Sequence, residues 1–427
     1  MSHYELLIIG AGAAGLAASE AAQQKNIHHI ILEASHRIGG RGLTEYLRLD
    51  DSGQSCAVDL GCHWMHSASL NPYVEWADKF GFQYDRHGPR DKTLNSFEAD
   101  LFPERMYFDG NWLGRDKHIQ WQDCLNEFDV QLRLQMRKSG PASLWDVMDN
   151  TRYANDEVKA AHAYWLSLMH SNDPDQVCFE DMLNYQDTEE DWPLLEGYGA
   201  LIARQGEACP VSLNTSVRCV DWQGKKIRID TNKGTMTADK VIITVSTGVL
   251  NSGDIQFVPK LPESKREAID ALPMGNYNNL FFALDDFDSD LPSSVFYQNS
   301  GQTLAINIQP FSQSYLFACV AGRFAWWLEK QGSEATEYYL KQALADIFGS
   351  EFTSRLSHFK TSAWGFDPWV KGAYSSAAPG KFDARRMLAQ PINEQIYFAG
   401  EATSTDALNT AHGAYLSGKA ALVSAWS

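Results

Sequence analysis

The sequence predicts an α/β fold, and two stretches of the chain carry that prediction. The first forty residues read as an apolar strand at 5–9, a helix of small residues at 16–22 and a second apolar strand at 30–32. Residues 238–245 are rich in β-branched side chains, as in a strand that is buried on both faces. Buried strands that alternate with helices are typical of a parallel sheet covered by helices.

A glycine-rich turn joins the first strand to the first helix. It follows the pattern G-x-G-x-x-G, with Gly10, Gly12 and Gly15 at the fixed positions and Ala14 between the last two. The first glycine permits a tight turn, the second lets a pyrophosphate approach the positive helix N-terminus, and the third lets helix and strand pack closely. Glu33 ends the second strand 23 residues beyond Gly10, and its carboxylate would bind ribose hydroxyls. These features predict a Rossmann-type dinucleotide-binding unit.

A second glycine turn follows the strand that ends at Glu33. Ala34 is followed by Arg37, Gly40 and Arg41, and an arginine can fork onto phosphate oxygens. A second phosphate contact at this position favours FAD over NAD. A basic surface loop is the alternative interpretation.

The two turns together resemble those of a known family. The pattern E-A-x-x-R-x-G-G-R after G-x-G-x-x-G resembles the FAD-dependent amine oxidases, which include monoamine and polyamine oxidases, L-amino-acid oxidases and lysine-specific histone demethylases. Segments at 58–66, 255–269, 362–375 and 396–421 resemble the same family. The resemblance implies a discontinuous FAD-binding domain at 1–66, 195–258 and 385–427. A mixed α+β substrate domain at 67–194 and 259–384, with a helical subdomain near 115–185, would be inserted into it.

Composition narrows the classes of protein to consider. The chain has 427 residues, 44% hydrophobic and 21% charged, which fits a soluble globular protein of two domains. A net charge of −18 disfavours nucleic-acid binding and is compatible with a cationic ligand. Seven scattered cysteines argue for a reducing compartment. With no signal peptide and no run of about 18 apolar residues, we expect a cytoplasmic protein without a membrane span.

Two histidines distinguish the segment after residue 58. It contains Gly61, Cys62, His63 and Trp64, which the resemblance makes expected FAD contacts. Together with His66 it gives a His-Trp-x-His pattern that looks most like animal-type polyamine oxidases, in which this segment runs toward the flavin. The resemblance makes His66 an active-site candidate, and Ser67 stands where that group usually has glycine. No third ligand matches the histidine pair, so we predict no metal site.

The middle of the chain is less informative. Residues 71–81 have helical spacing and a glycine stop, and 115–185 reads as mostly helical. We interpret the aromatic residues of this helical region as core rather than as part of a substrate cage. An acidic cluster follows, made up of Asp187, Glu189, Glu190 and Asp191. We interpret it as a solvated loop, with attraction of a polycation as the alternative.

Asn279 is the most informative departure from the family pattern. The family usually has lysine there, which in the relatives holds a water against flavin N5 and is linked to the reaction with oxygen. Asparagine brings no positive charge, so the electron acceptor would be oxygen or another species, such as a quinone or a protein. Lys371 is a candidate for a compensating cation. Earlier in the chain, the resemblance implies that the backbone of Val217 contacts adenine.

The last segments supply the remaining site residues. Trp364 and Tyr374 would lie against the flavin, the latter on its substrate side. Ala373 occupies the place of the cysteine that links flavin in monoamine oxidases, so we expect non-covalent FAD. A final strand and helix would complete the sheet, with the helix N-terminus toward the dinucleotide. The FAD contacts expected there are Gly400, Glu401, Thr410 and Ala411.

The resemblance implies FAD-dependent oxidation of a primary or secondary amine, with di- and polyamines as first candidates. Hydride would pass to flavin N5, and the resulting imine would hydrolyse to an aldehyde or ketone. The expected catalytic and positioning residues are His66, Asn279, Trp364, Tyr374 and Thr410. Two other classes stay open: a flavoenzyme that desaturates carbon–carbon bonds, and a flavin-binding protein without turnover.

Overall fold

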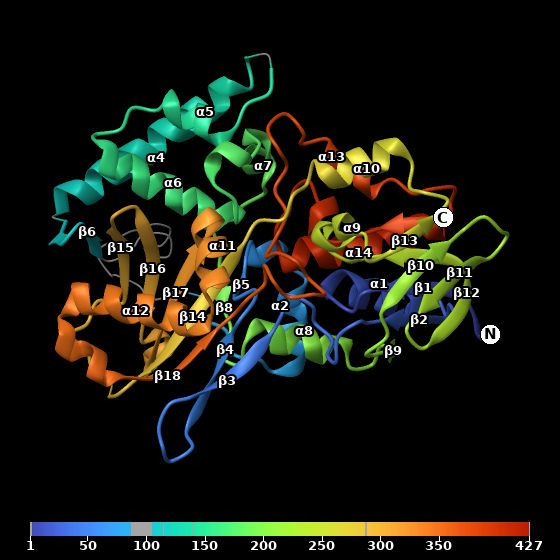
Figure 1. The fold of residues 1–427 in the computed structure, drawn as a ribbon, viewed down its shortest axis with the longest axis horizontal. Coiled ribbons are helices and arrows are strands. Elements are labelled where there is room, and N and C mark those ends of the chain that lie inside the picture. Colours follow the sequence, from blue (N-terminus) through green and yellow to red (C-terminus); the bar gives the residue numbers. More distant parts are fainter. Residues whose placement is uncertain (1, 87–104, 114, 139, 287, 427) are drawn as a thin grey trace.

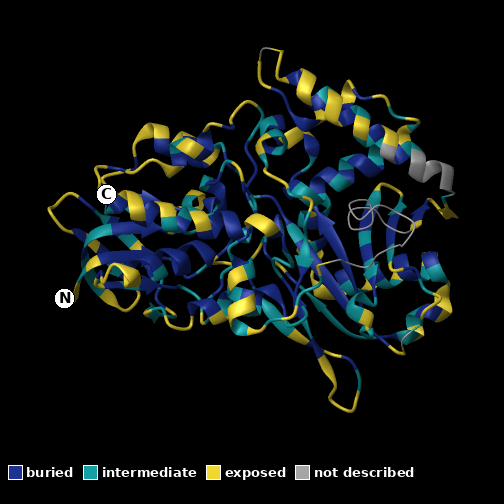
Figure 2. Cartoon of the chain, turned by 180° about the vertical axis from the view of Figure 1, so that it is seen from behind, coloured by how far each residue is buried: buried dark blue, intermediate teal, exposed yellow. Residues whose placement is uncertain are grey.

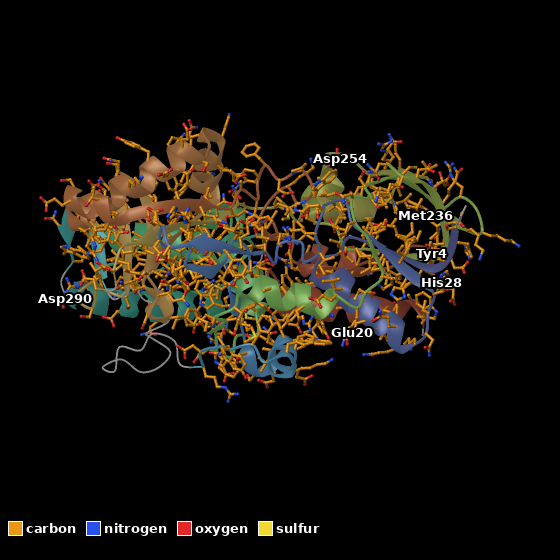
Figure 3. All side chains as sticks on the ribbon, turned by 90° about the horizontal axis from the view of Figure 1, so that it is seen from below. Tyr4, Glu20, His28, Met236, Asp254 and Asp290 are labelled. Atoms are coloured by element: carbon orange, nitrogen blue, oxygen red, sulfur yellow. The ribbon has the colours of Figure 1, made fainter. Side chains whose placement is uncertain are left out.

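Two sheets, one toward each end of an elongated molecule, organise the fold (Figure 1). The computed structural model describes residues 2–86, 105–113, 115–138, 140–286 and 288–426. Both termini lie at the end that holds the first sheet, as do Tyr4, His28 and Met236, whereas Asp290 lies at the opposite end (Figure 3). The predicted α/β class is confirmed.

The first sheet has the order β13-β10-β11-β12-β1-β2-β9, with β19 also beside β12. Its strands are β1 (Ser2–Ile9), β2 (His29–Leu32), β9 (Val211–Ser212), β10 (Val217–Asp221), β11 (Ile227–Thr231), β12 (Gly234–Ile243), β13 (Gln256–Val258) and β19 (Ile396–Phe398). β1 is parallel to both β2 and β12, and β19 is parallel to β12. The carboxyl ends of these four strands therefore meet at one edge, where ligands of such sheets bind.

Helices cover both faces of the first sheet. They are α1 (Ala13–Gln24), α8 (Tyr198–Gly206), α9 (Thr247–Ser252), α10 (Glu263–Asp270), α13 (Ala384–Ala389) and α14 (Ala411–Ala425). Leu6 and Ile8 of β1 pack with α1 and α14, whereas Leu7 and Ile9 pack with α10 and α13. Burial on both faces explains the continuous apolar run of this strand.

The second sheet has the order β18-β14-β17-β16-β15-β6-β7. Its strands are β6 (Arg105–Phe108), β7 (Asn111–Trp112), β14 (Tyr277–Leu284), β15 (Ser294–Asn299), β16 (Gln302–Ile308), β17 (Tyr315–Ala321) and β18 (Leu356–Thr361). β15 and β6 are parallel, and the other neighbours are antiparallel. α11 (Gly322–Gln331) and α12 (Ser333–Phe348) pack on the face that carries Leu280 and Phe282.

The remaining elements connect or cover the two sheets. The expected helical character of 115–185 is confirmed by α4 (Arg115–Gln135), α5 (Leu144–Asp149), α6 (Asp156–His170) and α7 (Phe179–Asn184). The helix expected at 71–81 is α2 (Tyr73–Phe80), which ends at Gly81 in the left-handed region. β5 (Trp64–Met65) pairs with β8 (Trp192–Pro193). β3 (Thr44–Arg48) and β4 (Ser55–Asp59) form a hairpin that projects from the molecule, with an exposed tip (Figures 1 and 2).

The division into domains stays a proposal. The first sheet draws its strands from three separated parts of the chain, which supports a discontinuous nucleotide-binding domain. Among the residues that the structure describes, none of the helices has the length and apolar character that crossing a bilayer requires.

Lys265 fastens α10 to the end of α13. Its side chain is buried, and Nζ donates to the carbonyls of Met387, Leu388 and Gln390 at 2.6, 2.8 and 2.6 Å. Lys265→Met is expected to lower the free energy of unfolding by about 3 kcal/mol, because three carbonyls lose a buried charged donor.

Urea denaturation measures this loss. Lys233→Met is the matched control, because Lys233 makes one exposed bond of the same kind, to the carbonyl of Leu213. The control is expected to change the free energy of unfolding by less than about 1 kcal/mol. Equal losses in the two variants would contradict the assigned role of Lys265.

Candidate functional site

One continuous cavity of about 880 Å³ joins the carboxyl edge of the first sheet to the inner face of the second. It begins at the glycine turn after β1 and reaches α6 and β17. Every candidate site residue from the sequence lines it except Gly15. Gly15 serves packing instead, because a Cβ there would lie 1.9 Å from the carbonyl oxygen of Gly10.

The N-terminus of α1 faces the cavity as an open anion site. Gly12 is its N-cap, no side chain caps it, and its first turn holds no acidic residue. A Cβ at Gly12 would meet only the Cα of Gly40, at 3.9 Å, so the protein leaves free space where the backbone amides point. The amides and the helix dipole suit a pyrophosphate.

Glu33 fixes the shape of the first glycine turn. Its carboxylate accepts from the backbone amides of Ala11 at 2.7 Å and Ser35 at 2.8 Å, and the side chain is buried beside the cavity. Arg37 holds the second turn, since its guanidinium donates to the carbonyls of Ile38, Gly40 and Gly42. The position of Arg37 therefore has a structural explanation in addition to the expected phosphate contact.

A chain of ion pairs and hydrogen bonds links the second glycine turn to α7. Arg41 pairs with Glu401 at 2.9 Å and also donates to the carbonyl of Ala373. Glu401 accepts from the hydroxyl of Ser375, which lies against Arg385. Arg385 in turn pairs with Asp181 of α7 at 2.7 Å, with both side chains fully buried. A buried pair broken on one side is strongly destabilising, so this chain holds the cavity wall in place.

The second helix N-terminus at the cavity belongs to α14. Thr410 caps it by accepting from the amide of Gly413 at 3.0 Å, and its hydroxyl donates to the carbonyl of Ala407 at 2.7 Å. Thr410 and Ala411 both line the cavity. Two helix N-termini, a buried carboxylate just after β2 and a Cβ-free cradle fit a dinucleotide. The residue at position 373 is alanine, so that side chain offers no atom for a covalent link.

Asn279 fastens the segment 59–61 to the second sheet. Its Nδ2 donates to the carbonyls of Asp59 at 3.0 Å and Gly61 at 3.3 Å, and its Oδ1 accepts from the thiol of Cys319 at 3.4 Å. Both amide hydrogens are thus used within the protein. Lys371 pairs with Asp254 at 3.1 Å and is not among the cavity-lining residues.

Aromatic side chains form much of the cavity wall next to Asn279. Trp364 is buried and donates from Nε1 to the carbonyl of Leu60 at 2.8 Å. Tyr374 donates its hydroxyl to the carbonyl of Leu168 in α6, and its ring lies 6.0 Å from that of Tyr277. These bonds fix the two rings in place, as a substrate-orienting wall requires.

His66 forms an ion pair at the opposite wall. Its Nδ1 lies 2.7 Å from Oδ1 of Asp191, and Asp187 lines the cavity nearby. Burial acts to lower the pKa of His66, but the charge and hydrogen bond of Asp191 and the charge of Asp187 raise it above the ordinary value. Burial, aided by the charge of Asp191, raises the pKa of the Asp187 carboxyl.

The acidic cluster lies partly at the cavity. Asp187 and Asp191 line the cavity, whereas Glu189 and Glu190 do not. Asp187 is also exposed to solvent and Asp191 is half-buried, so the solvated-loop interpretation and the attraction of a polycation are compatible for these two residues.

The backbone conformation of Ser67 explains why glycine is favoured at this position. It adopts the left-handed conformation with φ 48° and ψ 51°, a region that favours glycine. Its hydroxyl donates to the carbonyl of Gln186 at 2.9 Å. That bond ties the histidine segment to the loop that carries Asp187 and Asp191.

Sequence reasoning missed several cavity residues. Trp165 and Met169 of α6 line the cavity, as do Trp121 of α4 and Tyr185. Trp121 and Trp165 also pack in apolar clusters of this region, so the expectation that they belong to the core holds without excluding a place at the cavity wall. Tyr277 and Cys319 also line it. Tyr277 lies two residues before Asn279 on β14, and Cys319 pairs with Asn279 across to β17. The period-2 alternation of β14 was a usable signal for Tyr277, whereas the pairing with β17 was not visible in the sequence.

Comparisons with known proteins agree with this geometry. A family model described as flavin containing amine oxidoreductase matches residues 13–421. Polyamine oxidase 4 of Oryza sativa subsp. japonica is 26% identical over 97% of this chain and 87% of its own length. Lysine-specific histone demethylase 2 of Homo sapiens is 26% identical over 97% of this chain and 52% of its own length. The chain therefore spans about half the length of that demethylase.

A solved structure shares the fold over the whole chain. An engineered variant of putrescine oxidase superposes with a TM-score of 0.81, covering 100% of this chain and 99% of that one, at 16% sequence identity. Likeness at this level of identity shows a common architecture and leaves the chemistry to the site residues.

Proposed function

The chain belongs to the flavin-containing amine oxidoreductase family, and from that premise we propose that it binds FAD non-covalently and oxidises an amine. The observation that carries the proposal is the continuity of the cavity, which runs from the N-terminus of α1 past Asn279 to the His66–Asp191 pair. A dinucleotide and a small cation can therefore occupy adjoining parts of one space.

The nucleotide end would be held by groups of the chain that already face the cavity. The open amides of α1 would bind the pyrophosphate, Glu33 the ribose, and the backbone at Val217 the adenine. When bound, FAD supplies the acceptor for the hydride that leaves the amine-bearing carbon. Trp364 and Tyr374 would exclude water and orient the substrate at that end.

The carboxylates of Asp187 and Asp191 at the cavity wall support a diamine or polyamine as substrate. The charge of Asp191 is balanced by His66 at 2.7 Å, so Asp187 is the carboxylate of these two that can meet a substrate cation. The reacting amine would lie at the aromatic wall, with a second ammonium near Asp187. A desaturase for neutral hydrocarbons would have no use for this carboxylate, which favours the amine over that alternative.

The acceptor and the location are part of the same proposal. Arg37 and Arg41 are the fixed cations among the described residues that line the cavity, and both donate to protein oxygens. With Asn279 uncharged, we assign reoxidation to an acceptor other than oxygen, such as a quinone or a protein. The seven free cysteines support a reducing, cytoplasmic location.

Anaerobic titration tests the reaction class directly. Purified protein is mixed with monoamines, diamines, polyamines and neutral alkenes, and loss of the oxidised flavin absorbance is followed. Amines are expected to bleach the flavin. Bleaching by an alkene with none by any amine would favour the desaturase, and no bleaching at all would favour a binding protein without turnover.

Asp187→Asn is expected to weaken diamine binding about tenfold, a loss of about 1.4 kcal/mol, because the second ammonium loses its carboxylate. Binding of a monoamine of the same chain length should change little. Spectral titration of the oxidised flavin with each amine gives both dissociation constants.

Glu189→Gln is the matched control for Asp187→Asn. It removes one charge from the same loop, and Glu189 is exposed as Asp187 is, but Glu189 does not line the cavity. The control should leave both dissociation constants unchanged. Equal weakening of the diamine and the monoamine by Asp187→Asn would contradict the role of Asp187.

A further inference from the structure

His63 presents one ring nitrogen to the cavity and buries the other. It lines the cavity, yet its side chain is only 9% exposed. Nδ1 is fully enclosed and makes no hydrogen bond with the described residues. Nε2 is not enclosed in this way, so it is the nitrogen available to a ligand. The ring is held between Trp64 and Phe317, at centroid distances of 4.6 and 5.1 Å.

A buried carboxylate lies behind the enclosed nitrogen. Oδ2 of Asp59 is 3.6 Å from Nδ1 of His63 and accepts from the amide of Tyr198 at 2.8 Å. Oδ1 accepts from the hydroxyl of Thr44 at 2.5 Å and the amide of Gly199 at 3.1 Å. This carboxylate is fixed in place and 1% exposed, and its Oδ2 faces Nδ1 of His63 from beyond hydrogen-bond distance.

The two histidines of the turn have opposite environments. His66 has a hydrogen-bonded carboxylate, and its pKa is raised, whereas burial and the charge of His66 lower the pKa of His63 to about 4. Burial raises the pKa of Asp59 to about 6 despite its hydrogen bonds. Cys62, Tyr198 and Tyr315 also interact electrostatically with Asp59, and burial raises the pKa of each. Neighbouring titratable groups whose pKa values are shifted in opposite directions are a usual sign that one acts as an acid and the other as a base.

We infer that His63, backed by Asp59, is the proton acceptor for the reacting amine. The inference rests on the proposed amine oxidation. The N–H bond of the substrate ammonium breaks, its proton bonds to Nε2 of His63, and the electron pair stays on the amine nitrogen. That pair is needed to form the C=N bond as hydride leaves the adjacent carbon. His63 afterwards releases the proton to water.

The walls of the cavity make this transfer feasible. An alkylammonium in water has a pKa near 10.4, well above that of an imidazole, but desolvation lowers the pKa of a buried ammonium by several units. The carboxylate of Asp59, 3.6 Å from Nδ1, would attract an imidazolium and so oppose the burial that lowers the pKa of His63 to about 4.

His63→Gln is expected to slow anaerobic flavin reduction about a hundredfold at pH 7, the lower end of general-base contributions. The variant must wait for substrate that is already neutral, so its rate should rise about tenfold per pH unit. Near pH 10 the loss should shrink to within about threefold, because most of the free amine is then neutral. Rates are normalised to flavin content.

Two further measurements separate proton transfer from packing. His63→Ala should recover activity when imidazole is added, which a purely structural role would not allow. In protein labelled with ¹⁵N-histidine, the His63 signal should move to the protonated position when a diamine without hydrogen on the carbons next to nitrogen is added. That measurement uses a compound that cannot react, so it does not depend on turnover or on a variant that folds.

His28→Gln is the control variant. His28 stacks on Tyr4 at 4.8 Å at one end of the molecule (Figure 3) and does not line the cavity, so the variant should keep the wild-type pH profile. If no amine reduces wild-type flavin, the proposed function fails and the inference with it. If amines reduce it but His63→Gln keeps the wild-type rate and pH profile, or the ¹⁵N signal stays neutral, the inference alone is overturned.

Discussion

Gly12→Val is expected to give folded protein that purifies without flavin and has no activity. Gly12 has φ −79° and ψ −177°, which any residue adopts, so the substitution imposes no backbone strain. An added Cβ meets only Gly40, at 3.9 Å. The valine side chain would instead fill the space in front of the α1 amides, where the pyrophosphate is proposed to bind.

Gly15→Val is the informative counterpart. A Cβ there would lie 1.9 Å from the carbonyl oxygen of Gly10, so the packing of α1 on β1 cannot form without a shift of the backbone. This variant should lose stability, whereas Gly12→Val should lose ligand. Thermal unfolding reports the first effect, and visible absorbance per polypeptide and calorimetric titration with FAD report the second. Full flavin content in Gly12→Val would refute the assignment of the pyrophosphate site.

The nucleotide half of the molecule was predictable because its constraints are local. Gly10 and Gly15 satisfy backbone demands within one turn, and Glu33 bonds to Ala11 only 22 residues away along a single strand–helix–strand unit. Chain order is enough to bring such groups together. The family resemblance is confirmed for the same reason, since its motifs mark these fixed turns.

The substrate half was less predictable because its contacts join distant segments. Asp59 meets Tyr198, Asn279 meets Gly61, and Tyr374 bonds to Leu168 only after both sheets and α6 have packed. No local pattern records these distances.

The difference between two histidines of one turn was also hard to predict from the sequence. His63 and His66 are three residues apart, and the resemblance implied a cofactor contact for His63 and an active-site role for His66. The burial that sets His63 apart comes from Phe317 on β17 and from the fold around Asp59. Chemical character here is a property of tertiary packing rather than of residue type.

Asn279→Lys is expected to speed reoxidation by oxygen about a hundredfold, because a fixed charge at a reacting centre is worth roughly 2.7–4 kcal/mol and each 1.36 kcal/mol is tenfold in rate. A cation at this position would stabilise the superoxide that forms as oxygen takes up an electron. The lysine Nζ can also donate to the carbonyls of Asp59 and Gly61, which Asn279 now holds at 3.0 and 3.3 Å, so the segment keeps a donor.

Stopped-flow mixing with oxygenated buffer measures this step after reduction by dithionite, so the result does not depend on the identity of the amine. Asn279→Met is the matched control, since it has similar bulk and no charge. A gain with lysine and none with methionine would support the electrostatic role of position 279. Equal rates in the two variants would leave the charge without effect. Wild-type reoxidation in air as fast as amine turnover would refute the proposal of another acceptor.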